Sequence, residues 1–174
     1  MRKLIMFNNV SLDGCFTDAR GDMSWAHKDP QDKEWNDFTA ANAGGRGTLV
    51  FGRVTYELMA GFWPTPMAKQ MMPEVAAGMN RMPKVVFSRT LRQVTWENTR
   101  LMKGDLVTEM RKLKKSSDRD LVILGSGSLV AQLAPAGLID EFRIVVAPLA
   151  LGRGRTLFDG IKQRLPLKLA GTRT

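Results

Sequence analysis

The sequence predicts an α/β protein in which a mostly parallel sheet carries helices on its faces. Short apolar runs alternate with amphipathic segments along the chain, which is typical of parallel strands joined by helices. The length supports this interpretation, because 174 residues with 44% hydrophobic content are enough to form a core. We therefore expect a single domain that spans residues 1–174.

In the first half of the chain, predicted strands alternate with predicted helices. The runs KLIMFNNVSL, TLVFG and KVVFSRT are apolar and end at turn-forming residues, so we expect them to be buried strands. Residues 32–45 predict a helix that ends at a glycine pair, and RVTYELMAGFW predicts another up to Gly61. The methionine- and proline-rich segment 64–83 predicts a broken helix or a surface loop.

The second half continues the same alternation. A weaker strand is expected within residues 94–102, and GDLVTEMRKLKK predicts a surface helix with Asp105 at its start and basic residues near its end. DLVILG, SLVAQLAPAG and IDEFRIVVAPLAL then predict a strand, a helix and a strand. We expect LPLKLAGTR to complete the pattern.

Composition limits the location and the partners. A single cysteine, Cys15, excludes an internal disulfide and fits a reducing compartment, and no run approaches the roughly 18 apolar residues of a membrane span. We therefore expect a cytoplasmic protein. The formal net charge of +9 permits an anionic partner, which is a nucleotide cofactor, a phosphorylated metabolite or nucleic acid. Charge alone does not choose among them.

Similar chemistry follows three of the predicted strands. After TLVF come Gly52, Arg53 and Thr55, and after KVVF come Ser88 and Arg89. The turn LGSGSL has Gly125 and Gly127 for close backbone approach, and Ser128 is expected to cap the next helix. In a parallel sheet, ligands bind where strand carboxyl ends meet helix N-termini.

Each of these turns has a purely structural interpretation when taken alone. The glycine/serine turn does not match the dinucleotide fingerprint G-x-G-x-x-G, because Val130 stands at the last glycine position. Their occurrence at successive strand ends, in a basic chain, instead favours a site for a dinucleotide.

Six motifs, in order along the chain, resemble the dihydrofolate reductase-like family: VSLDG, GDMSW, LVFGRVTYE, VVFSRT, DLVILGSGSLVAQL and GLIDEFRIVVAPLALGRGRTLF. Within it, the chain is similar to the C-terminal reductase domain of the bifunctional riboflavin-biosynthesis deaminase/reductase. The resemblance covers nearly the whole chain and implies a three-layer α/β/α fold. Its central sheet is mixed, mostly parallel, and binds NADPH.

The resemblance also implies roles for the strand-end residues. Arg53 and Thr55 would meet the cofactor phosphates, and Ser88 and Arg89 the adenosine 2′-phosphate. The pyrophosphate and the nearby ribose would lie against the turn formed by Gly125, Ser126, Gly127, Ser128 and Leu129. Arg153 and Arg155 are interpreted as a solvated basic turn.

The substrate side would be the exit of the first strand, with Asp13 and Trp25 as the main candidates. Asp13 is the first choice for the catalytic residue, because hydride transfer needs a proton source; the alternative is a turn-forming aspartate. Trp25 lines the pocket in one interpretation and the core in the other. Other residues of this region carry less weight: Asp29, Asp32 and Asp37 as further carboxylates, His27 as a solvent-exposed residue, and Cys15 without a visible basic partner.

The chain also departs from its relatives. Cys15 stands where riboflavin-pathway reductases usually carry a basic residue, which argues against a phosphorylated substrate. Asn36 and Asp37 compete for the place of the carboxylate that contacts the pterin in dihydrofolate reductases. The family's usual last strand is missing or short, so we expect a sheet edge that is incomplete or completed by a partner chain.

The leading hypothesis is an NADPH-dependent reductase of a small heterocyclic or ribosylamino-pyrimidine-like substrate. Its activity would resemble that of 5-amino-6-(5-phosphoribosylamino)uracil reductase or dihydrofolate reductase, with no metal. The alternative is an NADPH-binding module or sensor with little turnover. Nucleic-acid binding is disfavoured, because the basic residues are scattered and no nucleic-acid motif is present. By resemblance we expect a homodimer, with residues 142–151 at the contact.

Overall fold

The computed structural model of the protein describes residues 2–26, 32–43, 45 and 47–173. A six-stranded sheet has the order β5-β4-β3-β6-β1-β7, and every pairing in it is parallel. A separate antiparallel ribbon joins β2 to β8. The strands are β1 (Leu4–Ser11), β2 (Cys15–Asp18), β3 (Thr48–Gly52), β4 (Lys84–Phe87), β5 (Thr99–Met102), β6 (Leu121–Leu124), β7 (Glu141–Ala147) and β8 (Gly154–Thr156).

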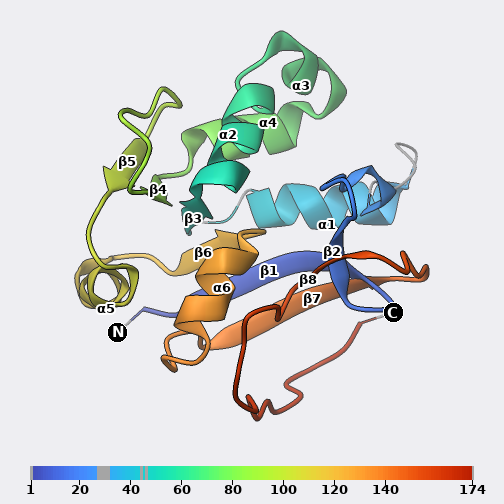
Figure 1. Ribbon diagram of the computed structural model, residues 1–174. Helices are drawn as coiled ribbons and strands as arrows, with labels where there is room; N and C mark the ends of the chain where they lie inside the picture. Colours follow the sequence, from blue (N-terminus) through green and yellow to red (C-terminus); the bar gives the residue numbers. More distant parts are fainter. Residues whose placement is uncertain (1, 27–31, 44, 46, 174) are drawn as a thin grey trace.

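Helices cover both faces of the six-stranded sheet, which gives the expected three layers. Figure 1 shows α1 to α4 on one side of the sheet and α5 and α6 on the other. One buried cluster joins the sheet to α5 and α6, and a second joins it to α2 and α4. The helices are η1 (Ser24–Ala26), α1 (Lys33–Ala43), α2 (Arg53–Phe62), α3 (Pro66–Met71), α4 (Pro73–Arg81), α5 (Leu106–Ser116) and α6 (Gly127–Leu133).

Most helix boundaries follow from local sequence signals. The Asp105 carboxylate accepts a hydrogen bond from the N–H of Thr108 and so caps α5, as the sequence predicts. Pro73 begins α4 immediately after α3, so the predicted broken helix is confirmed. None of the helices in the described ranges is both long and apolar enough to cross a membrane.

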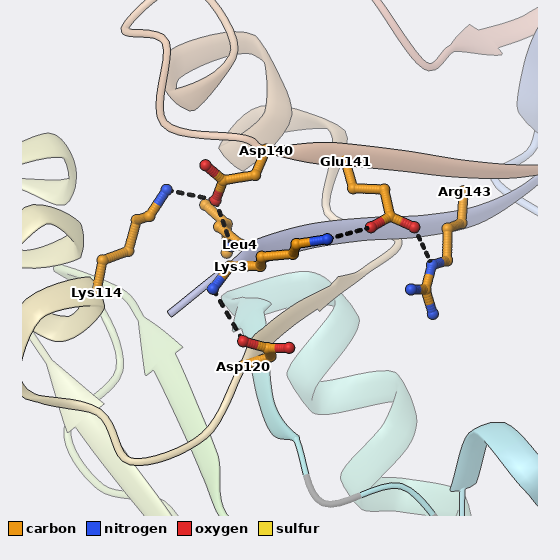
Figure 2. Close-up of polar contacts among 7 residues, drawn as sticks. All are labelled: Lys3, Leu4, Lys114, Asp120, Asp140, Glu141 and Arg143. Carbon is orange, nitrogen blue, oxygen red and sulfur yellow. Dashed lines mark hydrogen bonds and ion pairs between the residues drawn. The ribbon is translucent and has the colours of Figure 1, made fainter. Parts of the chain in front are cut away.

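The buried ammonium of Lys114 and two carboxylates fix the amino end of the inner strand β1 (Figure 2). Lys114 of α5 is 5% exposed, and its Nζ donates to the Leu138 carbonyl at 2.8 Å and to Asp140 Oδ2 at 2.5 Å. The same Asp140 oxygen accepts from the N–H of Leu4 at 2.7 Å. On the other side of β1, the N–H of Lys3 donates to Asp120 Oδ1. The start of β1 is thereby held between the segments that lead into β6 and β7.

Lys84 is a second buried cation at the amino ends of the strands. It is 1% exposed, and its Nζ donates to the carbonyls of Met79, Asn80 and Met82, which end α4. The ammonium also lies 4.4 Å from the ring centroid of Trp96. These contacts satisfy the last carbonyls of a helix that has no glycine cap.

The burial of Lys84 predicts a pH-dependent stability. Burial lowers the pKa of Lys84 to about 8, whereas an unfolded lysine has a pKa of about 10.4. Between these values the unfolded chain binds more protons, so the free energy of unfolding contributed by this residue rises with pH. Urea unfolding of the wild type and of Lys84→Met from about pH 7.5 to 10 should show their difference shifting in favour of the wild type. A constant difference would contradict the prediction, and exposed Lys69→Met is the control.

The structure differs from the sequence-based expectations in three places. The β2–β8 ribbon was not predicted, because its strands are short and lie in glycine-rich segments. The segment 165–173 contains no strand. All pairings of the described six-stranded sheet are parallel, whereas a mixed sheet was expected. The outer side of β7 has no neighbour there, which agrees with the expected incomplete edge.

Candidate functional site

The strand order places a topological switch point between the carboxyl ends of β3 and β6. These strands are neighbours, but β3 leads through α2 to α4 toward β4, whereas β6 leads through α6 to β7 on the opposite side. The two connections therefore diverge onto opposite faces of the sheet. Such a switch point is where open α/β sheets bind ligands.

Ser126 connects the two strand ends at this switch point. Its hydroxyl accepts a hydrogen bond from the N–H of Gly52 at 3.0 Å and lies 3.0 Å from Thr55 Oγ1. Its own N–H also donates to Thr55 Oγ1, at 3.2 Å. Ser126 is 6% exposed, so these bonds are shielded from water. We call Gly52, Thr55 and Ser126 the strand-end clasp.

The glycine/serine turn has an unusual backbone. Gly125 and Ser126 both have positive φ, at 57° and 53°, and Gly127 packs under the Phe16 ring, where an added Cβ would come within 3.1 Å. Ser126 occupies the N-cap position of α6, so the expectation that Ser128 caps this helix is wrong. Ser128 lies exposed in the first turn, and Leu129 is buried in the core.

The end of β4 lies beside the end of β3. Gly52 pairs in register with Phe87, so Arg53 and Ser88 leave neighbouring strands together. Ser88 Oγ accepts from the N–H groups of Thr90 and Leu91 and lies 3.4 Å from Thr90 Oγ1, where either hydroxyl can be the donor. Arg89 is exposed.

The arginines at these strand ends have different surroundings. The Arg53 guanidinium pairs with Glu57 one turn along α2 at 2.8 Å, and both side chains are about half exposed. Arg89 lies close enough to Asp105 to help lower the pKa of that carboxyl, after the larger effect of the Thr108 groups. A ligand phosphate can therefore approach either cation from solvent, although it must compete with Glu57 for Arg53.

Asp13 joins two loops at the end of β1. Its Oδ1 accepts from the Ser11 hydroxyl at 2.5 Å and from the N–H of Leu151, and its Oδ2 accepts from the N–H of Gly152 at 2.8 Å. The Ser11 hydroxyl and then the two backbone groups lower the pKa of Asp13. The carboxylate is therefore ionised at neutral pH and holds the loop after β7.

The remaining sequence candidates are placed as follows. Trp25 is half-buried in η1, and its buried Nε1 has no hydrogen-bond partner among the described residues. Cys15 is buried in β2, and its N–H donates to Ser11 Oγ. Asp32 precedes α1 and accepts from the N–H of Trp35, and Asp37 pairs with Lys33. Arg153 and Arg155 are exposed beside and within β8, while His27 and Asp29 lie outside the described residues.

Sequence reasoning missed two asparagines in the last half of β1. Asn8 Nδ2 and Asn9 Oδ1 are buried atoms without a hydrogen-bond partner in the part of the chain that the structure describes. The sequence signal for them was a pair of amides inside an otherwise apolar strand. Such amides are informative because buried polar groups nearly always have a hydrogen-bond partner.

The donor set fits a dinucleotide. In spatial order, β4 contributes Ser88 and Arg89, β3 contributes Arg53, and β6 contributes the turn at 125–129. β1 follows with its unpartnered amides, about 14 Å from β4 at the usual strand spacing. The described residues contain no group of three or more metal-ligating side chains.

The fold and this edge define a three-layer α/β protein with a candidate nucleotide site at its switch point. The family model of the RibD C-terminal domain matches residues 2–174, and the chain belongs to this reductase-like family.

Relatives and solved structures agree with this assignment. The Bacillus subtilis (strain 168) protein YyaP, itself uncharacterised, is 32% identical over 99% of this chain and 89% of its own length. The uncharacterised YwjB of the same organism is 26% identical over 99% of this chain and 91% of its own. A crystal structure of a candidate riboflavin biosynthesis protein from Shewanella sp. PV-4 superposes with a TM-score of 0.75, at 24% identity over 98% of this chain and 91% of that one.

The Thermotoga maritima diaminohydroxyphosphoribosylaminopyrimidine deaminase/5-amino-6-(5-phosphoribosylamino)uracil reductase has the same fold. Its TM-score is 0.62 at 14% identity, over 97% of this chain and 51% of that longer one. At this identity the likeness shows the fold alone.

The clasp predicts a specific mutational effect. Thr55→Val keeps the shape of the side chain but removes the acceptor for the Ser126 N–H and hydroxyl, so a buried donor is left unpaired. We expect the free energy of unfolding to fall by about 1–3 kcal/mol. Thr55→Ser retains the oxygen and should lose much less. Denaturant unfolding measures both, and equal losses in the two variants would contradict the role of the hydroxyl.

The contacts of Asp13 predict a stability effect that depends on pH. Because its pKa is lowered in the folded protein, Asp13 stabilises the fold above the unfolded pKa of about 3.9, and this contribution disappears as the pH falls through the folded value. Asp13→Asn should therefore lower the Tm at neutral pH and approach the wild type under acid conditions. Thermal unfolding across this range measures the effect, and a difference that grows on acidification would contradict it.

Proposed function

We propose that this protein is an NADPH-dependent reductase of the riboflavin-biosynthesis/dihydrofolate reductase-like group. The observation that carries the proposal is the spatial order of the strand ends, in which arginine, hydroxyl and glycine groups follow one another toward β1. Membership of a reductase-like family supports the same reaction class. The substrate would be a small heterocyclic or ribosylamino-pyrimidine-like compound.

Each part of the edge has a role in this proposal. Ser88 and Arg89 bind the adenosine 2′-phosphate, while Arg53 and the turn from Gly125 to Leu129 bind the pyrophosphate. The reduced nicotinamide supplies the hydride when it is bound. Thr55 contributes by holding Ser126, because its oxygen is already used within the clasp.

A second candidate function is an NADPH-binding module or sensor with little turnover. The contacts of Asp13 favour it, because a carboxylate ionised at neutral pH has no proton to donate. The proposed catalytic role of Asp13 is tested by NADPH oxidation in Asp13→Asn with a substrate from a screen of pyrimidines and pterins. Loss of oxidation with unchanged NADPH affinity supports that role, and unchanged oxidation contradicts it.

The proposal includes a cytoplasmic homodimer with β7 at the contact. β7 is the outer strand of the described sheet, and Ile144 and Val146 on it are 37% and 56% exposed. Burial of these side chains in a partner would remove apolar surface from water. Sedimentation of the wild type and of Val146→Asp tests the contact.

The first experiment is a titration with NADPH and NADH, followed by tryptophan fluorescence and energy transfer to the reduced nicotinamide, at low and high salt. Clear preference for NADPH supports the dinucleotide site. Binding of neither nucleotide would overturn the proposal and leave the strand-end residues with a structural role.

Arg89 should determine the preference between the two nucleotides. Arg89→Ala removes a charge-assisted contact to the 2′-phosphate worth about 1.5–3 kcal/mol, so NADPH should bind roughly 10- to 100-fold more weakly while NADH changes little. Arg119→Ala is a matched control, because Arg119 lies at the amino end of β6, away from the site. Equal weakening of both nucleotides by Arg89→Ala would exclude a 2′-phosphate contact.

A further inference from the structure

The outer edge of β5 is unpaired in the described sheet. β5 ends the strand order on one side, and none of the described strands pairs with it there (Figure 1). The carbonyls of Asn98 and Met102 accept hydrogen bonds from N–H groups at the start and just beyond the end of β4, so they point inward. Backbone groups alternate in direction along a strand, so those of Thr99 and Leu101 point outward. They are available to a further strand.

The two faces of β5 carry different side chains. Met102 packs on the cluster that contains α5, whereas Leu101 packs on the cluster that contains α2 and α4. By strand alternation Arg100 lies on the α5 face, and its Nη2 is 3.8 Å from Met102 Sδ. The half-buried side chains of Leu91 and Val94 belong to the same cluster as Leu101. One face of this edge is therefore cationic and the other is apolar.

A groove runs between β5 and α5 on the cationic face. Two cavities of about 410 Å³ and about 470 Å³ share Arg100, Leu113 and Ser116, so they adjoin, and we call them together the β5–α5 groove. Its helix wall is formed by residues 109, 112, 113 and 116, which lie on one face of α5. Its lining includes none of the strand-end residues proposed to bind the cofactor. The groove is therefore separate from the strand-end site.

The groove has an excess of positive charge at its surface. Its lining includes three exposed cations, Arg100, Lys103 and Lys112, and one carboxylate, Glu109. Glu109 Oε1 accepts from Lys112 Nζ at 2.7 Å, which neutralises that lysine. Arg100 and Lys103 have no carboxylate partner in the part of the chain that the structure describes. An anionic group that enters the groove therefore meets two cations that are not already paired.

These charges select the kind of strand that can occupy the edge. A second copy of β5 would bring Arg100 and Lys103 of both chains together, and like charges across a strand pair are destabilising. An acidic strand instead places carboxylates beside Arg100, while its alternate side chains lie on the apolar face beside Leu101. Strand addition of this kind uses backbone bonds for affinity and alternate side chains for specificity.

We propose that the outer edge of β5 and the β5–α5 groove bind an extended acidic peptide segment of a partner protein, which adds to the sheet as a further strand. Acidic and apolar side chains alternate along this segment. The acidic ones pair with Arg100 and Lys103 in the groove, and the apolar ones cover Leu101. Because the cofactor site is separate, saturating NADPH should leave peptide binding unchanged.

The test uses fluorescein-labelled peptides and the full chain, with binding measured by fluorescence anisotropy. The first peptide is Val-Glu-Val-Glu-Val-Glu, and the second replaces each glutamate with lysine. The third keeps the glutamates but is N-methylated at every peptide bond, which removes the backbone donors. We expect the wild type to bind the first peptide at least about tenfold more tightly than either of the others, and more weakly at high salt.

A charge reversal locates the site. Arg100→Glu should weaken binding of the glutamate peptide about tenfold, because a cross-strand attraction becomes a repulsion. Arg153→Glu makes the same change of charge at an exposed position beside β8 and should leave binding unchanged. Both side chains are exposed, so thermal unfolding should give the wild-type Tm for both variants.

Three results would overturn the inference. If the wild type does not bind the glutamate peptide, the cations of β5 only protect an edge strand from association. If the N-methylated or the lysine peptide binds equally well, strand addition or charge selection is excluded. If Arg100→Glu retains the wild-type affinity, the peptide binds elsewhere. None of these results depends on NADPH binding, so they leave the proposed function standing.

Discussion

The insertion of β6 between β3 and β1 is the constraint on which the rest of the structure depends. β6 lies late in the sequence, but it pairs in parallel with two strands from the first third of the chain. The connection after it leaves in the direction opposite to the connection after β3, and the switch point follows from this topology. The Ser126 hydroxyl and N–H bond to Gly52 and Thr55 at the end of β3, so the turn that enters α6 is fixed against the neighbouring strand end.

At the amino ends of the strands, charged groups tie strands to helices. Lys84 and Lys114 are buried there, the Asp140 side chain is 40% exposed, and each has several hydrogen-bond partners. At the carboxyl ends the clasp is likewise satisfied, whereas Asn8 and Asn9 have buried atoms without partners among the described residues. Satisfied polar networks stabilise a fold, whereas unsatisfied ones lower its stability unless a ligand completes them.

Sequence patterns predicted the strands and helices whose signals are local. Apolar runs gave β1, β3, β4, β6 and β7, and Asp105 gave the start of α5. The Ser126 cap was missed because its left-handed backbone depends on Thr55, which is 71 residues away in the chain. For the same reason a phosphate contact was predicted for Thr55, whereas in the structure its Oγ1 bonds to Ser126 within the clasp. Contacts between distant segments cannot be read from periodicity.

Asp13 and Asn9 show why the side chains of a site are harder to predict than its position. Asn9 lies in the last half of a predicted strand, and Asp13 follows that strand. The sequence correctly placed the end of this strand at the same edge of the sheet as the other strand-end turns. Which of them interacts with a ligand depends on partners contributed by other segments. The loop at 151–152 gives Asp13 backbone donors, whereas the end of β6 at Leu124 leaves Asn9 without a neighbouring strand on that side. Topology therefore gives the aspartate hydrogen-bond partners within the fold, whereas Asn9 Oδ1 has none among the described residues.

Cys15 shows the same dependence on neighbouring segments. It is 5% exposed in β2, and its N–H bonds to Ser11 Oγ. A basic side chain at this position would be buried, and burial of an unpaired cation is strongly unfavourable. Burial therefore explains why an uncharged residue stands here, whereas Arg53 and Arg89, which follow β3 and β4, keep their cations in solvent.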